Sequence, residues 1–196
     1  MVSLTRTDVT TMPSPRIRTD RLDLIPATIA ILESDRDDRR TLARLLNAAV
    51  PASWPPPLLD EGTLGEFVRM MAERPDPQFI CWYWIRDDPA SGERILIGSG
   101  GIASSPTAQD TVLIGYSVLD EFQGRGYATE AVRGMIPVVF SLPGIRRIMA
   151  TTYPDLAASI RVLEKCGFVY AGEAPPGEGI EEGTAVYVRE HQGGRA

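Results

Sequence analysis

The chain has 196 residues, of which 43% are hydrophobic and 23% are charged, and its formal net charge is −6. This length and composition fit one globular domain. The negative charge argues against a nucleic-acid-binding protein, because such proteins need positive charge to meet phosphates. It favours cationic ligands such as amines or basic peptides. No apolar run approaches the roughly 20 residues needed to span a bilayer, and residues 1–8 lack a signal-peptide core, so we expect a cytoplasmic protein without a membrane partner.

The residue types that hold metals or form disulfides are scarce. Cys81 and Cys166 are too few for a disulfide framework, and both lie in apolar surroundings, so we expect buried free thiols. His191 is the only histidine and lies in a polar tail. We therefore expect no metal site and no catalytic triad built around a histidine.

The N-terminal half predicts a flexible arm, a strand and two helical segments. Residues 1–15 carry two prolines and no periodic apolar pattern, so we expect an arm before a single domain of residues 16–190, and a tail at 191–196. Residues 21–25 alternate as a strand does, and the apolar spacing over 28–50 is helical. Asp60 is a plausible N-cap for a further helix.

The segment between those helices, residues 51–57, contains three consecutive prolines and Trp54. Such a run stiffens the backbone into an extended form. One interpretation is a rigid connector between helices. The other is a wall of a substrate cleft, with Trp54 as an aromatic lid over the substrate.

The C-terminal half alternates strands and helices. Residues 79–85 and 94–98 predict a hairpin whose Trp82 and Trp84 share one face, more plausibly a core face than a ligand surface. A central strand is expected at 112–119, a helix at 128–140 that Pro137 kinks or divides, a strand at 146–153, and a helix at 157–166 that Gly167 ends. Two last strands, 168–171 and 184–188, flank an acidic, glycine-rich loop at 172–183. We therefore expect a mixed α/β sheet with helices on both faces.

A glycine turn between the central strand and the following helix carries the main chemical signal. Gly124 and Gly126 let a ligand approach backbone N–H groups at a helix N-terminus, which is how proteins hold phosphates. No Lys-Ser/Thr pair follows, so this is not a P-loop, and the third glycine of a dinucleotide fingerprint is missing. The residues alone leave a phosphate site and an ordinary tight turn open.

Two spaced motifs resemble the GNAT superfamily of N-acetyltransferases. They are Gln123-x-x-Gly126-x-Ala128, after Gly115-Tyr116, and the segment from Ser159 to Phe168. The chain looks most like the RimJ/RimL-type branch. Its segment Thr19-x-Arg21-Leu22 also resembles the first strand of that branch. The resemblance implies a GNAT-type α/β (α+β) fold, a mixed, mostly antiparallel twisted sheet with helices on both faces. In that family two neighbouring strands splay apart, and the thioester arm of the cofactor fills the gap.

The resemblance also implies acetyl-CoA as co-substrate. Backbone N–H groups of the glycine turn would hold its pyrophosphate, with Arg125 offsetting the charge. The central strand would pair its backbone with the pantetheine arm, and an N–H near Val118 would polarise the thioester carbonyl. The expected cofactor-binding residues are Ser117, Val118, Gln123, Gly124, Arg125, Gly126, Tyr127, Ala128 and Thr129.

Ser159 and Tyr116 are the candidate catalytic residues, and Trp54 is the candidate substrate contact. Ser159 matches the serine of the RimJ/RimL-type pattern, and its hydroxyl would donate to the leaving thiolate; the alternative is a helix serine bonded to its own backbone. Many family members carry an asparagine where Leu156 stands and a tyrosine acid where Leu163 stands. The general base stays open between relayed water and a carboxylate of Asp60–Glu61 or 178–182.

The function expected from this pattern is transfer of acetyl from acetyl-CoA to a primary amine. A protein N-terminus and a small-molecule amine are both open acceptors, and so is the oligomeric state, including a homodimer. The alternatives are a CoA-binding sensor without catalysis, for which the leucines at 156 and 163 argue, and a nucleotide-binding domain of another superfamily.

Overall fold

A computed structural model describes residues 15–56, 59–72, 79–88, 91–174 and 183–191 of the chain. The expected arm and tail lie outside these ranges except for Pro15 and His191, and so does most of the loop at 172–183. The described part forms one sheet of eight strands in the order β1-β2-β3-β4-β5-β6-β8-β7. The strands are β1 (Ile17–Arg18), β2 (Leu22–Pro26), β3 (Ile80–Asp88), β4 (Glu93–Ser104), β5 (Thr111–Val118), β6 (Arg147–Thr152), β7 (Val169–Glu173) and β8 (Ala185–Glu190).

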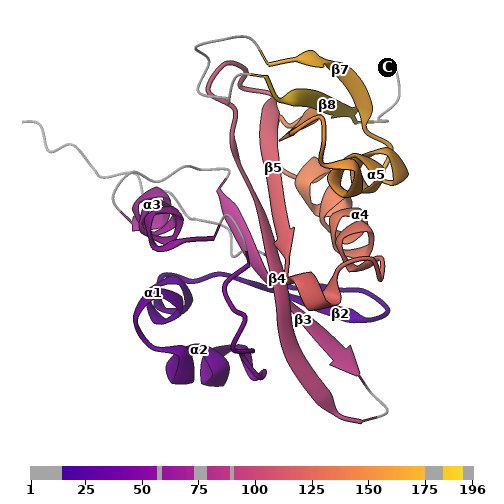
Figure 1. Ribbon diagram of the computed structural model, residues 1–196. Coiled ribbons are helices and arrows are strands. Elements are labelled where there is room, and N and C mark those ends of the chain that lie inside the picture. The colour runs from indigo at the N-terminus through magenta and orange to yellow at the C-terminus, as the bar shows by residue number, and fades with distance from the viewer. Residues whose placement is uncertain (1–14, 57–58, 73–78, 89–90, 175–182, 192–196) are drawn as a thin grey trace, which may run out of the picture.

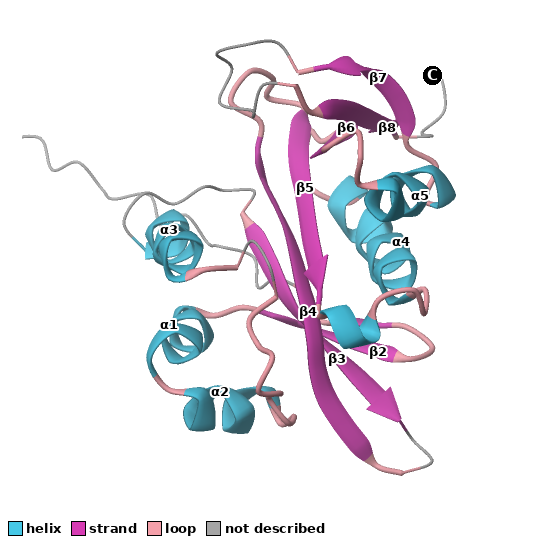
Figure 2. Cartoon of the chain, in the orientation of Figure 1, coloured by secondary structure: helices cyan, strands magenta, loops and turns pink. Residues whose placement is uncertain are grey.

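Helices cover both faces of this sheet, as the sequence predicts (Figures 1 and 2). One face carries α1 (Ile29–Asp37), α2 (Arg39–Leu46) and α3 (Glu61–Ala72), and the other carries α4 (Tyr127–Phe140) and α5 (Ala157–Lys165). A short 3₁₀ turn, η1 (Asp120–Phe122), joins β5 to the loop before α4. The α/β expectation is confirmed, and no helix within the described ranges is long and apolar enough to cross a membrane.

Each face of the sheet buries its own hydrophobic core. Successive strand residues point to opposite faces, so Trp82 and Trp84 of β3 join the core beneath α4 and α5. Tyr83, which lies between them, joins the core beneath α1, α2 and α3. All three are fully buried. The prediction that the tryptophans belong to the core is confirmed, and both cysteines are buried free thiols as expected.

The helical segment predicted over 28–50 is two helices, because Asp38 interrupts it. Asp38 has extended backbone angles and ends α1 while capping α2. Its Oδ1 accepts from the N–H groups of Arg40 at 3.0 Å and Thr41 at 3.2 Å. An aspartate bonds local backbone N–H groups in this way more readily than it continues a helix. Asp60 caps α3 as predicted, accepting from Thr63 N–H at 2.8 Å, and α4 continues through Pro137 as one helix.

Trp54 lies inside the protein instead of over a cleft. Its side chain is 2% exposed and belongs to the core beneath α1, α2 and α3. Its Nε1 donates to Asp35 at 2.6 Å, and the Tyr83 hydroxyl donates to the other carboxylate oxygen at 2.7 Å. Burial raises the pKa of Asp35 more than these two bonds lower it. The expectation of an aromatic lid does not hold in this arrangement, because the ring offers no surface to a substrate.

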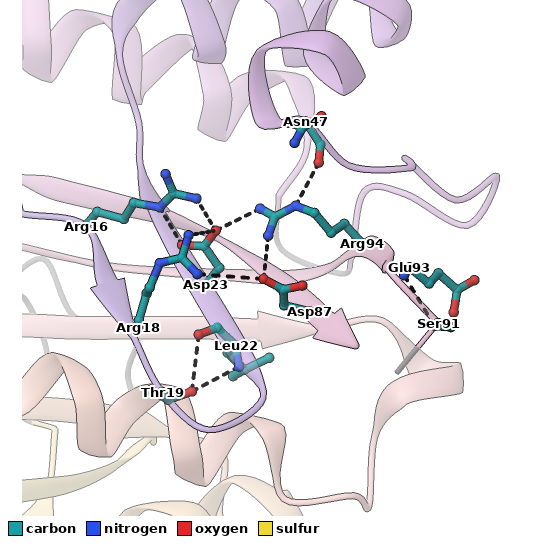
Figure 3. A network of polar contacts seen from close by, with 10 residues as sticks. All are labelled: Arg16, Arg18, Thr19, Leu22, Asp23, Asn47, Asp87, Ser91, Glu93 and Arg94. Atoms are coloured by element: carbon teal, nitrogen blue, oxygen red, sulfur yellow. Dashed lines mark hydrogen bonds and ion pairs between the residues drawn. The ribbon is translucent and has the colours of Figure 1, made fainter. Parts of the chain in front are cut away.

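A buried carboxylate ties the first three antiparallel strand pairs together (Figure 3). Asp23 of β2 is 1% exposed and accepts hydrogen bonds from Arg16 and from Arg94, the latter at 2.7 Å. Arg94 also binds Asp87 at 2.6 Å and the Asn47 carbonyl at 2.9 Å. Burial raises the pKa of Asp23, but the bonds from the two arginines outweigh it, so the pKa lies below its ordinary value.

Replacing Asp23 with asparagine is expected to lower the free energy of unfolding by about 3 kcal/mol at pH 7. This is near the low end of the range for breaking a buried ion pair, because Arg16 can hydrate when released. The pKa of Asp23 is lower in the folded protein than in the unfolded chain, where it is about 3.9. Ionised Asp23 therefore contributes fully to the free energy of unfolding above that pH, and the contribution is lost as the pH falls through the folded pKa. Urea denaturation at pH 7 and at steps below pH 4 measures both effects.

The matched control for this substitution is Asp37→Asn. Asp37 forms an exposed pair with Arg36 at 2.7 Å, and exposed pairs contribute little to stability. A difference between wild type and the Asp23 variant that stays constant below pH 4, or equal losses in both variants, would contradict the assignment of Asp23.

Candidate active site

The site begins where β5 and β6 stop pairing. These two strands are the one parallel pair of the sheet, and their ladder covers Thr111↔Arg147, Val112↔Ile148 and Leu113↔Met149. β5 continues to Val118 and β6 to Thr152 without further partners between them. We call this unpaired stretch between the carboxyl ends of the two strands the gap; α4 contacts β5 and α5 contacts β6 on one face of the sheet. In open α/β sheets such a position is where ligands bind.

Backbone hydrogen-bond groups of β5 face this gap. Antiparallel pairing alternates the direction of the backbone polar groups along a strand. The carbonyl of Thr111 and the N–H of Leu119 bond to residues of or next to β4, so odd-numbered residues of β5 are turned toward β4. Tyr116 and Val118 are consequently turned toward β6, in the stretch where β6 no longer pairs. The chain thus presents an open strand edge, suited to a ligand that carries amide groups.

Of the predicted strand residues, Ser117 fits this edge less well than its neighbours. It pairs with Ser99 of β4, which engages its backbone. By strand alternation its side chain faces the side of α1, α2 and α3. Its backbone is therefore held within the sheet, and the two residues that flank it carry the open edge.

The glycine turn after η1 leaves the N-terminus of α4 uncapped. Gly124 and Gly126 have φ values of +73° and +82°, which side chains rarely adopt. Gly126 is the N-cap, has no side chain to cap the helix, and accepts the first helical bond from Glu130 N–H at 3.0 Å. The N–H groups of Tyr127, Ala128 and Thr129 therefore have no acceptor within the helix. Together with the helix dipole, they form a site suited to an anion.

The remaining residues of the turn differ in role. Gln123 donates its N–H to the Asp120 carbonyl at 3.1 Å, and its side-chain amide to the Val118 carbonyl at 3.0 Å and to Asp120 Oδ1 at 2.8 Å. These bonds shape the turn and leave no N–H of its backbone for a ligand. Arg125 is exposed, with its guanidinium 5.9 Å from the centre of the Phe122 ring. Tyr127 is buried in the core beneath α4.

The structure brings the two candidate catalytic residues together. The Tyr116 hydroxyl reaches across from β5 to α5, where it donates to the Ser159 carbonyl at 3.3 Å and lies 3.3 Å from Ser159 Oγ. The Tyr116 ring stacks on Trp84, with ring centres 6.4 Å apart. Burial raises the pKa of Tyr116 to about 12, so the hydroxyl keeps its proton at neutral pH. These two hydroxyls lie beside the gap.

The two leucines that depart from the family pattern have different surroundings. Leu163 is 1% exposed within the core beneath α4 and α5, whereas Leu156 is about half exposed at the N-cap of α5 and makes no side-chain cap. Neither supplies a polar group. The His191 ring packs against Phe140 at a tilt, with ring centres 4.8 Å apart, and the His191 backbone N–H donates to the Arg146 carbonyl. Both contacts give His191 a structural role.

Sequence reasoning assigned no ligand role to a cluster under the glycine turn. Glu130 of α4 accepts from Thr19 Oγ1 at 2.6 Å and from Arg21 N–H at 2.8 Å, and its Oε2 lies 2.6 Å from Arg21 Nε. Burial raises the pKa of Glu130, but these bonds outweigh it and the pKa falls below its ordinary value. These contacts make Glu130 a structural residue. The Thr19-x-Arg21 motif was the available signal, and its partner lies 109 residues away.

Comparison with known proteins agrees with this geometry. Residues 30–169 match the family model described as an acetyltransferase (GNAT) domain. A Bacillus subtilis relative, the uncharacterised protein YkkB, is 30% identical over 138 residues, which cover 70% of this chain and 78% of that protein. The family match therefore spans both the glycine turn and the Tyr116–Ser159 contact.

Solved structures share the fold at low sequence identity. Mycobacterium smegmatis RimJ in complex with CoA-disulfide is 18% identical, with a TM-score of 0.57, over 87% of this chain and 82% of that one. Aminoglycoside acetyltransferase AAC(6')-Ib in complex with coenzyme A is also 18% identical, with a TM-score of 0.58, over 87% and 95% of the two chains. These structures agree with the fold, and the match to the family model, together with the relative YkkB, shows that the chain belongs to the GNAT family and is an acetyl-CoA-dependent acetyltransferase.

Proposed function

We propose that this enzyme transfers the acetyl group of acetyl-CoA to a primary amine of a protein N-terminus or a small molecule. One observation carries the proposal: the gap between β5 and β6 opens beside the uncapped N-terminus of α4. An extended ligand with a charged phosphate end and an amide-bearing arm matches these two neighbouring features. Pyrophosphate fits the N–H groups at α4, and pantetheine amides fit the backbone of Tyr116 and Val118.

The reaction that we propose is direct nucleophilic transfer from the thioester to the amine, without a covalent enzyme intermediate. A neutral amine attacks the thioester carbonyl carbon, and the carbonyl oxygen becomes an oxyanion that a backbone N–H of the β5 edge, such as that of Val118, can stabilise. The C–S bond then breaks, the amide forms, and the electron pair stays on sulfur. The proton that the amine loses must finally reach that thiolate or the solvent.

We assign the Tyr116 and Ser159 hydroxyls to the leaving thiolate. A tyrosine with a pKa near 12 is a weaker acid than an ordinary thiol, whose pKa is about 8.5. Tyr116 therefore cannot give up its proton for good. It can stabilise the sulfur by donating a hydrogen bond, or pass a proton to the sulfur through Ser159 while it takes up the proton that the amine releases. Both hydroxyls together form a short relay whose parts act as one unit.

The class of amine that accepts the acetyl group does not follow from the fold. The neighbours of the same fold named above include an aminoglycoside acetyltransferase and RimJ, so the fold alone leaves the acceptor class open. The formal charge of −6 favours cationic acceptors, which both amine classes provide. A panel of both, assayed by release of free thiol, identifies the acceptor.

Donor binding is tested by a substitution at Gly126. Gly126→Asp places a carboxylate at the N-cap of α4, where it would repel pyrophosphate. Saturating acetyl-CoA or CoA, at about 100 times the dissociation constant, is expected to stabilise the wild type by about 2.7 kcal/mol and the variant far less. Thermal unfolding with acetyl-CoA, CoA, ATP and NAD in parallel measures this.

The control for that substitution is Gly144→Asp. Gly144 has a φ of +80°, close to the +82° of Gly126, and open space around it. The substitution therefore causes a similar backbone strain, but in the loop between α4 and β6, away from the glycine turn. Acetyl-CoA should stabilise this control variant against thermal unfolding as much as it stabilises the wild type. Equal stabilisation of the wild type by ATP or NAD, or no shift with CoA ligands, would overturn the donor assignment.

The roles of the Ser159 and Tyr116 hydroxyls are tested by removing each of them. Ser159→Ala and Tyr116→Phe should each lower kcat by about 100-fold, the low end for acid–base groups, and leave the KM for acetyl-CoA near that of the wild type. Because the two act as one unit, the double variant should lose little more than either single variant. Steady-state kinetics with the identified acceptor tests this.

Tyr170→Phe is the matched control, because Tyr170 is an exposed tyrosine of β7 and should leave kcat unchanged. Unaltered turnover in the Ser159 variant would remove Ser159 from the mechanism. Losses that multiply in the double variant would mean that the two hydroxyls act independently.

A further inference from the structure

We propose that Arg21 is a positioning residue for the phosphate groups of acetyl-CoA, because it fixes the peptide that joins Arg125 to Gly126. The inference rests on the proposed donor site, and it assigns a role to a residue from the opposite end of the chain. Arg21 lies in the turn between β1 and β2, whereas the peptide it holds lies in the turn before α4.

Two groups hold the Arg21 side chain in one position, the Glu130 carboxylate and the Tyr127 ring. Its Nε and one terminal nitrogen each lie 2.6 Å from Glu130 Oε2. Its guanidinium stands 4.5 Å from the centre of the Tyr127 ring, within the range of a cation–π contact. Glu130 is itself fixed by Thr19 Oγ1 and by the Arg21 N–H. The guanidinium is therefore oriented before any ligand arrives.

The remaining terminal nitrogen of Arg21 reaches the glycine turn. It donates to the Arg125 carbonyl at 3.1 Å. A peptide bond is planar and trans, so its C=O and N–H point in opposite directions. With the carbonyl held on the Arg21 side, the N–H of Gly126 points away from Arg21, at a turn that is exposed. Arg21 thus sets the direction of a donor that adjoins the free N–H groups of α4.

The role is geometric more than electrostatic. The charge of Arg21 is matched by Glu130 in direct contact, so the pair adds little net charge to the anion site. The planar fork of arginine, in contrast, reaches the Glu130 carboxylate and the Arg125 carbonyl at the same time. A lysine carries the same charge as a single ammonium and does not reproduce that fork.

The experiment compares acetyl-CoA binding by the wild type, Arg21→Lys and Arg21→Met, using calorimetry on the full chain. Both variants are expected to raise the dissociation constant about tenfold, as for loss of one well-formed hydrogen bond, while kcat at saturating acetyl-CoA stays unchanged. Glu130→Gln keeps an acceptor for Thr19 but loses the charge that orients Arg21, so it should also raise the dissociation constant. This variant replaces Arg21→Met in the test if Arg21→Met does not fold.

Arg147→Met is the matched control. Arg147 pairs with Glu190 at 2.8 Å and has a similar exposed fraction, but lies at the start of β6 where the sheet is closed. Wild-type affinity in Arg21→Lys would overturn the proposal in favour of a charge effect, and wild-type affinity in both Arg21 variants, or a fall in kcat, would overturn it outright. If the wild type itself binds acetyl-CoA no better than ATP, the donor assignment fails instead.

Discussion

The end of the ladder between β5 and β6 is the constraint on which the site depends. Parallel pairing stops at Leu113↔Met149, and every group assigned to the donor follows from that point. The β5 residues beyond it keep their pairing with β4 on one side, so the strand stays extended while its other edge opens. The same strand then leads through η1 to α4. One strand therefore sets both the edge that we propose for the pantetheine amides and its distance from the phosphate site that we propose at α4.

The glycine turn also depends on the turn between β1 and β2, which contains Thr19 and Arg21. The turn has few contacts of its own, because Gly124 and Gly126 carry no side chains and the residues are exposed. Its order comes from Gln123, bound to Asp120 and the Val118 carbonyl, and from Glu130, bound to Thr19 and Arg21. An anion site made of backbone groups thus needs side chains outside it to hold the backbone in place.

The sequence predicted what local pattern determines. Strand alternation placed Trp82 and Trp84 on a common core face, and the motifs located β5, the glycine turn, α4 and α5. It missed the division at Asp38, which depends on hydrogen bonds from the backbone N–H groups of the next residues to the Asp38 side chain. It also missed the burial of Trp54, which depends on a partner, Asp35, 19 residues away. It also gave Arg21 no role, since its contacts with Arg125 and Glu130 join residues more than 100 positions apart.

The contact between Tyr116 and Ser159 bears on how this chain manages without the tyrosine that many family members carry at the position of Leu163. Leu163 lies in the core, so α5 offers no phenol there. Tyr116 instead brings a phenol to α5 from the strand, on the face shared by Ile114 and Val118. Because Trp84 and the core bury it, its pKa rises to about 12. In the proposed mechanism, a donor of that kind stabilises the thiolate by hydrogen bonding, so protonation of sulfur draws on the proton that the amine releases.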